Sequence, residues 1–413
     1  MSTGPQTIAP IVPSTGMGLY VHVPFCKARC PYCDFNTYQR MEDLIGPYLE
    51  AVTTEIGLWG RVLRRPAVNT VFFGGGTPSY LPEGHIDRVL EAVRGAFHVR
   101  RDAEITVEAN PDDLDQAQYG GLLSQGVNRL SIGAQSLDDG LLALLGRRHG
   151  SAQAIEAFQG AQAAGFTNIN LDLMYGLPGQ SLAQWQDTLK RVVSLSPSHF
   201  SLYCLTLEEG TPLHRRVREG RLPEPDGDLA ADMYHHAREV LAEAGYHHYE
   251  ISNWAKALKN TSLEARHNIG YWRNLPYLGV GPGAHSRLGD YRFWDVSSPA
   301  RYIAKVKRWE EANPQPLGAL NGEVLRGVPP VGGREHIGPR LACSETMFLG
   351  LRLLDGLDLA EASAGAGADL EARYRPEIDD LIGLGLLERQ DGRLRLAASA
   401  YLIANQVFTR FVG

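Results

Sequence analysis

The sequence predicts an α/β protein: a partial barrel of six parallel strands, each followed by helix, and then a small winged-helix-like α+β domain. Six short apolar, β-branched runs alternate with segments of helical periodicity at intervals of about 25 to 45 residues, which is typical of parallel βαβ units. Residues with chemically useful side chains stand at the end of run after run. The last 70 or so residues instead show helices and one short hairpin.

The composition is that of an ordinary globular protein, and the few cysteines indicate a reducing compartment. The 413 residues are 44% hydrophobic and 21% charged, and 40 basic against 47 acidic side chains give a net charge of −7. This balance argues against a nucleic-acid partner, and no apolar run of about 18 residues predicts a membrane span. Five cysteines and no secretory signal pattern predict a cytoplasmic protein. Residues 1–16, uncharged and rich in Pro, Ser and Thr, are expected to be a disordered lead-in.

The strands and helices follow one another in a regular order. Leu19-Tyr20-Val21-His22-Val23 opens the series as the first strand. The later strands are expected at 70–73, 104–108, 129–133, 168–173 and 200–205. Helices are expected at 43–62, 85–97, 113–124, 137–145, 152–164, 182–195 and 229–243.

Right-handed crossovers place the carboxyl ends of all six strands on one face. The chemically distinctive residues come at or just after these ends, so we expect them to converge on one cavity. They are the cysteines near residue 30, the glycine run 74–76 with Thr77, and Glu108, Gln135 and Asp172.

The loop after the first strand carries Cys26, Cys30 and Cys33 at spacing C-x3-C-x2-C. Three thiolates at this spacing suit an iron–sulfur cluster with one iron left for a non-protein ligand, because Cys204 and Cys343 are far along the chain. The alternatives are a small zinc site, for which His22 is the only local fourth ligand, and a disulfide.

The other residues fit a single small ligand. Glycines let the backbone approach a ligand closely, Glu108 and Asp172 can accept hydrogen bonds from hydroxyls or an amine, and Arg147 can pair with a carboxylate. Taken singly, each has a simpler interpretation as a turn glycine, a helix cap or a solvated charge.

These motifs resemble the radical S-adenosylmethionine superfamily, whose fold is a partial (β/α)6 TIM-like barrel. YVHVPFC, CPYCDF, FFGGGTPS, EANP, RLSIGAQS, LGRRH and NLDLMYGLPGQ are similar to the oxygen-independent coproporphyrinogen III oxidase group. The resemblance implies a [4Fe–4S] cluster on Cys26, Cys30 and Cys33, S-adenosylmethionine chelated by its open iron, and an electron donor whose electron cleaves the sulfonium to a 5′-deoxyadenosyl radical. It also implies S-adenosylmethionine contacts from Tyr20, Gly75, Gly76, Thr77, Glu108, Gln135, Arg147 and Asp172, with Arg147 chosen over Arg148 as the arginine of the L-G-R pattern.

Two features resemble the heme chaperone branch of this group. The oxidases carry a further cysteine two positions beyond the third one, where this chain has Phe35. HNIGYW (267–272) matches the branch's H-N-x-x-Y-W signature, and GVGPGAHS (279–286) follows it. The signature implies heme binding, with His267 as a candidate iron ligand; the alternative is a structural corner. The pairs His235-His236 and His247-His248, on or beside the helix 229–243, are rivals.

The chain is therefore expected to divide into a core at 17–250, an extension at 251–313, a loop or linker at 314–342 and a C-terminal domain at 343–413. In the last of these, 376–396 predicts a helix and a hairpin around Asp391-Gly392, and its acidic residues argue against DNA. The predicted function is a heme chaperone that passes heme to an acceptor hemoprotein. The alternative is oxidative decarboxylation of coproporphyrinogen III in porphyrin biosynthesis.

Overall fold

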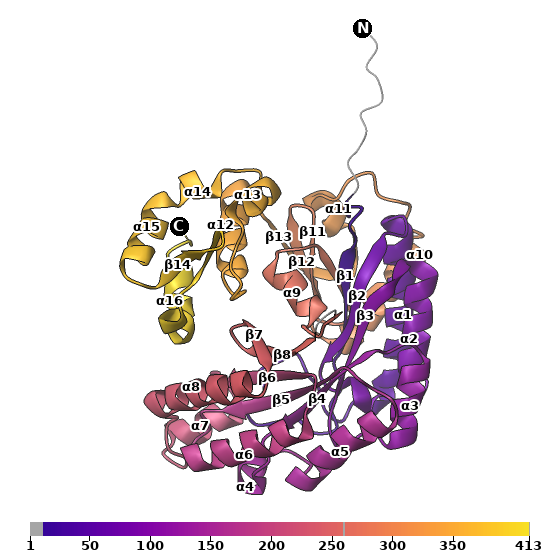
Figure 1. Ribbon diagram of the computed structural model, residues 1–413. Helices are drawn as coiled ribbons and strands as arrows, with labels where there is room; N and C mark the ends of the chain where they lie inside the picture. Colours follow the sequence, from indigo (N-terminus) through magenta and orange to yellow (C-terminus); the bar gives the residue numbers. More distant parts are fainter. Residues whose placement is uncertain (1–10, 259–260, 413) are drawn as a thin grey trace.

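The computed structural model describes residues 11–258 and 261–412. Its centre is a set of six parallel strands that alternate with helices, as the sequence predicts (Figure 1). The strands are β1 (Met17–Val23), β2 (Ala67–Gly75), β3 (His98–Ala109), β4 (Arg129–Gln135), β5 (Ile169–Tyr175) and β6 (His199–Cys204). They lie side by side in the order of the chain, each parallel to the next.

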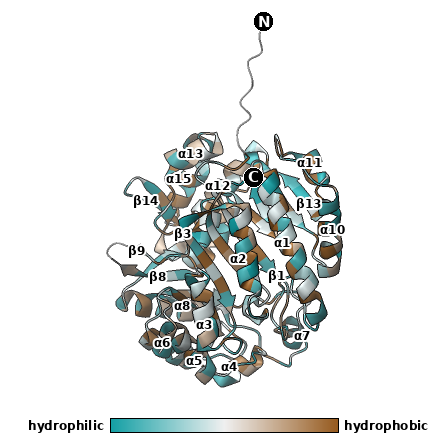
Figure 2. Cartoon of the chain, turned by 90° about the vertical axis from the view of Figure 1, so that its right-hand side faces the viewer, coloured by the Kyte–Doolittle hydropathy of each residue, from teal (hydrophilic) through white to brown (hydrophobic). Residues whose placement is uncertain are grey.

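Helices cover the outer face of these strands, and α1 and α2 lie side by side across it (Figure 2). Alternate strand residues such as Val21, Val71 and Leu171 are at most 1% exposed and form the main core with them. The helices that follow the strands are α1 (Ile45–Val62), α2 (His85–Ala96), α3 (Gln116–Ser124), α4 (Asp139–Leu144), α5 (Ser151–Ala163), α6 (Leu182–Leu195), α7 (Pro212–Arg218) and α8 (Gly227–Glu243). Short 3-10 turns, η1 (Glu42–Leu44) and η2 (Pro78–Tyr80), precede α1 and follow β2.

The inner face of the barrel is polar, unlike the outer one. Neighbouring strands bring Ser131, Asn170, Asp172 and His199 together, and hydrogen bonds join them into one network. Because side chains alternate along a strand, one face of each strand can build the core while the other forms a polar lumen.

Further strands extend the sheet at both edges, giving 13 in all. Beyond β1 lie β10 (Tyr277–Val280), β11 (His285–Leu288), β12 (Tyr291–Asp295) and β13 (Val331–His336); beyond β6 lie β7 (Tyr246–Glu250), β8 (Asn253–Leu258) and β9 (Thr261–Ser262). The helices α9 (Arg266–Trp272), α10 (Pro299–Glu311) and α11 (Gly322–Arg326) connect these strands.

Two of the sequence expectations need correction here. The segment 314–342, expected to be a loop or linker, contains α11 and β13, and β13 pairs with β12. Residues 1–10 of the expected disordered lead-in lie outside the described residues, but Ile11 and Val12 pack against the core and Thr15 accepts a 2.8 Å hydrogen bond from Asn69.

The C-terminal segment forms its own small core of helices around a two-stranded hairpin, which confirms the predicted α+β type. Its elements are α12 (Pro339–Gly350), α13 (Leu359–Ala366), α14 (Leu370–Arg373), α15 (Arg375–Gly383), β14 (Leu387–Gln390), β15 (Arg393–Leu396), η3 (Ala398–Ile403) and α16 (Ala404–Thr409).

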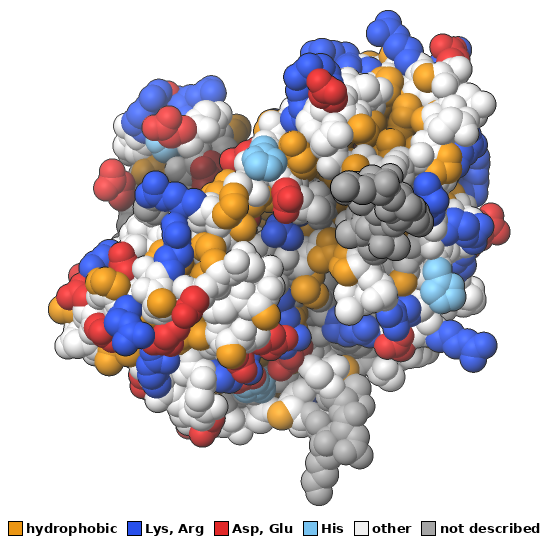
Figure 3. All heavy atoms as spheres, turned by 90° about the horizontal axis from the view of Figure 1, so that it is seen from above, with side chains coloured by type: hydrophobic (Ala, Val, Ile, Leu, Met, Phe, Trp, Pro, Cys, Tyr) orange, Lys and Arg blue, Asp and Glu red, His pale blue; other side chains and the backbone are white. Residues whose placement is uncertain are grey.

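On the face seen from above, Lys and Arg side chains are interspersed with Asp and Glu (Figure 3), so their fields partly cancel. Within the described residues, no helix combines the length and the apolar character needed to cross a membrane.

Candidate functional site

A cavity of about 480 Å³ opens at the carboxyl ends of the six strands. It collects most of the residues that the sequence singles out, from the loop after β1 and from β2, β3, β4 and β5. Cys26, Cys30, Cys33, Gly75, Gly76, Thr77, Glu108, Gln135, Arg147 and Asp172 all line it. The prediction that these separated residues converge on one cavity is confirmed.

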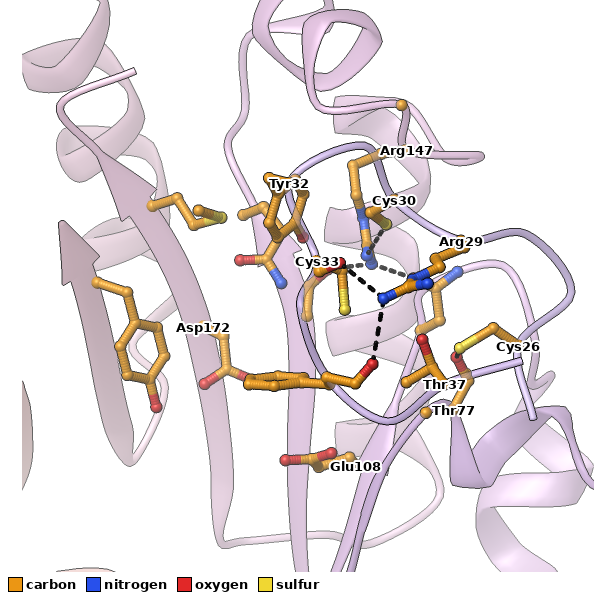
Figure 4. A pocket seen from close by; sticks show the side chains of 18 of the residues that line it. Cys26, Arg29, Cys30, Tyr32, Cys33, Thr37, Thr77, Glu108, Arg147 and Asp172 are labelled. Atoms are coloured by element: carbon orange, nitrogen blue, oxygen red, sulfur yellow. Dashed lines mark hydrogen bonds between the residues drawn. The ribbon is translucent and has the colours of Figure 1, made fainter. Parts of the chain in front are cut away.

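The cysteine loop is held by its own backbone and by the end of β2. The N–H of Cys26 donates to Tyr38 O at 2.8 Å, and the N–H of Cys33 donates to Cys30 O at 3.2 Å. The Arg29 guanidinium donates to Cys33 O at 3.2 Å, as Figure 4 shows. All three thiols are free of disulfides, and they lie in the wall of the cavity.

The surroundings of the thiols are only partly polar. Burial raises the pKa of the Cys26 and Cys33 thiols. Thr77 Oγ1 donates to the Cys26 sulfur at 3.4 Å, and Arg147 Nη1 donates to the Cys30 sulfur at 3.5 Å. A donor and a cation aimed at sulfur favour the deprotonated thiolate that binds metal.

The zinc alternative has no support in this geometry. His22 does not line the cavity; its Nδ1 is bonded to Tyr20 Oη at 2.9 Å and its Nε2 to Asn36 O at 2.9 Å. Across the described parts of the chain, no group of three or more His, Cys, Asp and Glu side chains is arranged to hold a single metal ion.

The glycines at the end of β2 allow the cysteine loop to pack closely. Gly75 has a φ of +106°, and a Cβ there would lie 2.4 Å from the His22 ring. A Cβ on Gly76 would lie 2.6 Å from Phe25 O, because its N–H donates to Val23 O at 2.7 Å. The close approach that requires glycine here is therefore that of the loop itself, which brings Cys26 beside Thr77.

Glu108 and Asp172 stand half-buried on the inner face of β3 and β5, in the wall of the cavity. Glu108 accepts a 3.2 Å hydrogen bond from the Gly75 N–H, while Asp172 accepts from Ser131 Oγ at 2.9 Å. Burial, and next the charge of Asp172, raise the pKa of Glu108 to about 8; burial also raises the pKa of Asp172. The two carboxyls thus offer hydrogen-bonding oxygens in a site that favours their neutral form.

The structure distinguishes the two neighbouring arginines. Arg147 donates to Cys30 and Gly133 O and contacts Asn110, whereas Arg148 is paired with Asp112 at 2.8 Å and Asp113 at 2.7 Å. Both line the cavity, but Arg147 alone of the two donates to a cysteine of the loop.

Gln135 ends β4 with a φ of 63°, a conformation that costs a residue other than glycine about 1–3 kcal/mol. The register between β4 and β5 shifts just before it. This irregularity turns the end of β4 at the wall of the cavity.

Tyr20 and His267 do not line the cavity. Tyr20 is bonded to His22, as described above. His267, 4% exposed, shares a small hollow with residues at the starts of β1 and β2, at the opposite end of these strands. Its Nδ1 is bonded to Thr70 Oγ1 and its Nε2 to Tyr271 Oη, both at 2.8 Å. The rival pairs lie where the sequence places them, His235 and His236 on α8 and His247 and His248 on β7 beside it.

The cavity also contains residues that the sequence analysis missed. Cys204, taken there as remote, lines it at the end of β6, next to Tyr203. The rule that strand ends carry site residues would have found both. Burial raises the pKa of the Cys204 thiol. Phe35 also lines the cavity and is 64% exposed.

Known proteins resemble this chain over its whole length. The family model described as the radical SAM superfamily matches residues 20–192, and the HemN C-terminal domain matches 340–403. The chain is 37% identical to "Heme chaperone HemW" of Mycobacterium tuberculosis, over 98% of this chain and 97% of the relative. It is 34% identical to the protein of the same name from Bacillus subtilis, over 95% and 98%.

Among solved structures, the coproporphyrinogen III oxidase HemN of Escherichia coli matches with a TM-score of 0.79. It is 23% identical, with 96% of this chain and 90% of that chain covered, so the likeness shows a shared fold. Together with the near full-length identity to the bacterial relatives, the matches settle the family. The chain belongs to the HemW branch of the radical SAM superfamily.

Proposed function

We propose that this protein is a heme chaperone, which binds heme and transfers it to an acceptor hemoprotein. The observation that carries the proposal is the 37% identity, over almost the whole of both chains, to a protein named as a heme chaperone. Phe35 also supports the proposal. The chain has this phenylalanine where the oxidases carry a further cysteine, as the motif resemblance indicates.

The radical SAM core would hold a [4Fe–4S] cluster on Cys26, Cys30 and Cys33. Three free thiols in one cavity wall, with Thr77 and Arg147 donating to two of the sulfurs, fit such a cluster. Once reduced by an electron donor, the cluster would supply one-electron chemistry to bound S-adenosylmethionine.

S-adenosylmethionine would lie across the cavity from strand to strand. Gly75, Gly76 and Thr77 would contact it by backbone and hydroxyl, Glu108 and Asp172 through hydroxyls or its amine, and Arg147 through its carboxylate. Gln135 completes the wall. Tyr20, expected to join these contacts, would act through His22, to which its hydroxyl is bonded.

Heme ligation by His267 stays a prediction, as does a cytoplasmic location. Both ring nitrogens of His267 are hydrogen-bonded, so iron ligation there would require Thr70 or Tyr271 to release the ring.

The test is a parallel titration of the cluster-reconstituted protein with hemin and with coproporphyrinogen III under anaerobic reducing conditions. We expect a Soret shift with hemin, followed by its transfer to an apo-hemoprotein, and no decarboxylated product. Formation of protoporphyrinogen with consumption of S-adenosylmethionine would instead establish the oxidase alternative. A protein that neither binds nor transfers hemin is not a heme chaperone.

A further inference from the structure

A heme chaperone needs an iron ligand that heme can reach from solvent. Histidine is a common ligand of heme iron, so the exposed histidines of this chain are the candidates. Four of them are exposed: His98, His235, His285 and His336. His98 begins β3, at the end of the strands away from the cavity, and His235 lies on α8. His285 and His336 both lie in the extended part of the sheet.

His285 lies on the inner face of the sheet, in line with β1. Tyr20 of β1 is paired with Gly279 of β10, and β10 is paired with β11 so that Gly279 stands opposite His285. His285 in turn is paired with Trp294 of β12. Because directly paired residues project to the same side, His285 and Trp294 share the inner face with Tyr20.

The imidazole of His285 is oriented by stacking. Its ring centroid lies 5.3 Å from that of Trp294, with 22° between the planes. On β13, Gly333 is paired with Trp294, and a Cβ there would lie 2.4 Å from the indole, so glycine lets the indole lie against the sheet. No described residue hydrogen-bonds to either ring nitrogen of His285, unlike those of His267. An exposed, oriented imidazole with a free ring nitrogen can serve as an axial iron ligand.

This surface is docked directly onto the cysteine loop. Asn36, which follows Phe35, donates through Nδ2 to Pro282 O at 2.8 Å and to Ser297 O at 3.0 Å. These two bonds connect the cysteine loop to the turn before His285 and to the segment after Trp294. Phe35 is 64% exposed and lines the cavity, so an apolar ring is carried by the same docked segment.

A cation is in place for the carboxylates of a heme. Arg287 is two residues from His285 on the same strand and face, about 7 Å along it. Its half-buried guanidinium donates through Nη1 to Asn274 O at 2.9 Å and forms no ion pair with a carboxylate in the described parts of the chain. An arginine short of an acceptor suits a propionate.

We propose that His285 is the axial ligand through which the heme iron is captured, with Trp294 orienting the imidazole and Arg287 pairing with a propionate. The proposal rests on the proposed function and specifies its site, beside the cysteine loop and not at His267. Heme held there would adjoin the cavity of the radical SAM core.

His336 provides a matched control. It is also exposed and lies beside an aromatic ring, with its centroid 5.1 Å from that of Tyr291. It is paired with Tyr291, three residues before Trp294 on β12, and so projects from the opposite face of the same sheet.

The experiment titrates the cluster-loaded wild type, His285→Ala, His336→Ala and His267→Ala with hemin, and separately with metal-free protoporphyrin IX. For His285→Ala we expect hemin affinity to fall by about tenfold or more, a lost ligand costing at least as much as a lost outer-shell partner, and the magnetic circular dichroism signal of axial histidine to disappear. Protoporphyrin binding should be unchanged, since it has no iron to ligate, and His336→Ala should match the wild type.

The controls separate the two proposals. If the wild type does not bind hemin, the proposed function fails. If the wild type binds hemin and His285→Ala gives the same affinity and spectrum, or if His267→Ala alone loses the axial signal, the assignment to His285 is wrong while the function stands. Iron content and circular dichroism of each variant show that it is folded, and restoration of the signal in His285→Gly by added imidazole would confirm the ligand.

Discussion

At the scale of single residues, the three loop cysteines differ sharply from the other two. We expect Cys26→Ser, Cys30→Ser and Cys33→Ser each to lose the brown iron–sulfur chromophore, because each removes one of the three protein ligands that we propose for the cluster. Cys343 is 1% exposed in the C-terminal core, and Cys204 lines the cavity from the end of β6, outside the cysteine loop. Serine at either position should therefore retain the cluster. Iron and sulfide analysis after reconstitution measures this, and a full cluster in Cys30→Ser would mean that the ligands are wrongly assigned.

Arg147 presents a second residue-scale prediction. Its guanidinium donates hydrogen bonds to the Cys30 sulfur and to Gly133 O, and it would also pair with the carboxylate of S-adenosylmethionine. Lysine keeps the charge but loses the planar fork, so Arg147→Lys should weaken S-adenosylmethionine binding by about 1.5–3 kcal/mol, the worth of a hydrogen bond to a charged group.

Arg148→Lys is the matched control for that variant. Its partners Asp112 and Asp113 lie away from the cysteine sulfurs, and a lysine can still pair with them. Its effect on affinity should stay below about 1 kcal/mol. Calorimetric titration of both reconstituted variants decides the matter; equal losses would contradict the choice of Arg147.

At the scale of elements, α9 depends on a carboxylate from a distant strand. No side chain of α9's own N-cap accepts its first N–H groups. Instead the two carboxylate oxygens of Glu104 accept from the N–H of Arg266 at 2.9 Å and of His267 at 3.0 Å. Glu104, 6% exposed, thus fixes the start of the HNIGYW helix from β3.

We expect Glu104→Ala to lower the free energy of unfolding by about 3 kcal/mol, since it leaves two buried N–H groups without a charged acceptor. The measurement is urea unfolding followed by circular dichroism. Glu371→Ala, which breaks the 2.6 Å pair with Arg389 on the surface, should cost less than about 1 kcal/mol. Similar losses in the two variants would show that Glu104 is not a cap.

The elements also show what a sequence of this kind can predict. The six barrel strands were placed well because one face of each is apolar with a period of two and the other carries polar groups that mark the site. The strand β13 was missed because Val331-Gly332-Gly333 has the composition of a loop. Gly333 is required there because the indole of Trp294, on the neighbouring strand β12, lies against it. Likewise HNIGYW was recognised, but only the fold decides that His267 lies at the end of the strands opposite the cavity.

At the scale of the whole molecule, the C-terminal domain is joined to the barrel through the edge strand β7. The N–H of Leu354 donates to Tyr249 O at 2.9 Å, and Glu250 forms an isolated bridge with Leu353. The Arg352 guanidinium lies 4.2 Å from the ring centre of Trp272 in α9 and 3.9 Å from the buried Glu250 carboxylate. The junction therefore connects the helix of the HNIGYW motif with the C-terminal domain.

His247 adds a titratable contact to this junction. Its Nδ1 lies 3.1 Å from Glu264 in the barrel part, and its Nε2 lies 3.4 Å from Asp355 in the C-terminal part. Asp355, then Glu264, raise the pKa of His247 from 6.5 to about 10; Arg393 and Arg395 face Asp355, and His248 adjoins on β7.

The sign of the pH dependence follows from that raised pKa. The charged form is stabilised in the folded state, so the contribution is complete below about pH 6.5 and is lost as the pH rises to about 10. The side chains of His247 and Asp355 are 41% and 71% exposed, so solvent screening keeps the contribution below about 1 kcal/mol. His247→Gln should accordingly be less stable than the wild type at pH 6 in urea unfolding, and the difference should vanish by pH 10. His235→Gln, on the exposed face of α8, should show no such trend; a His247→Gln difference that is constant or grows with pH would mean that the charge of this histidine does not hold the two domains together.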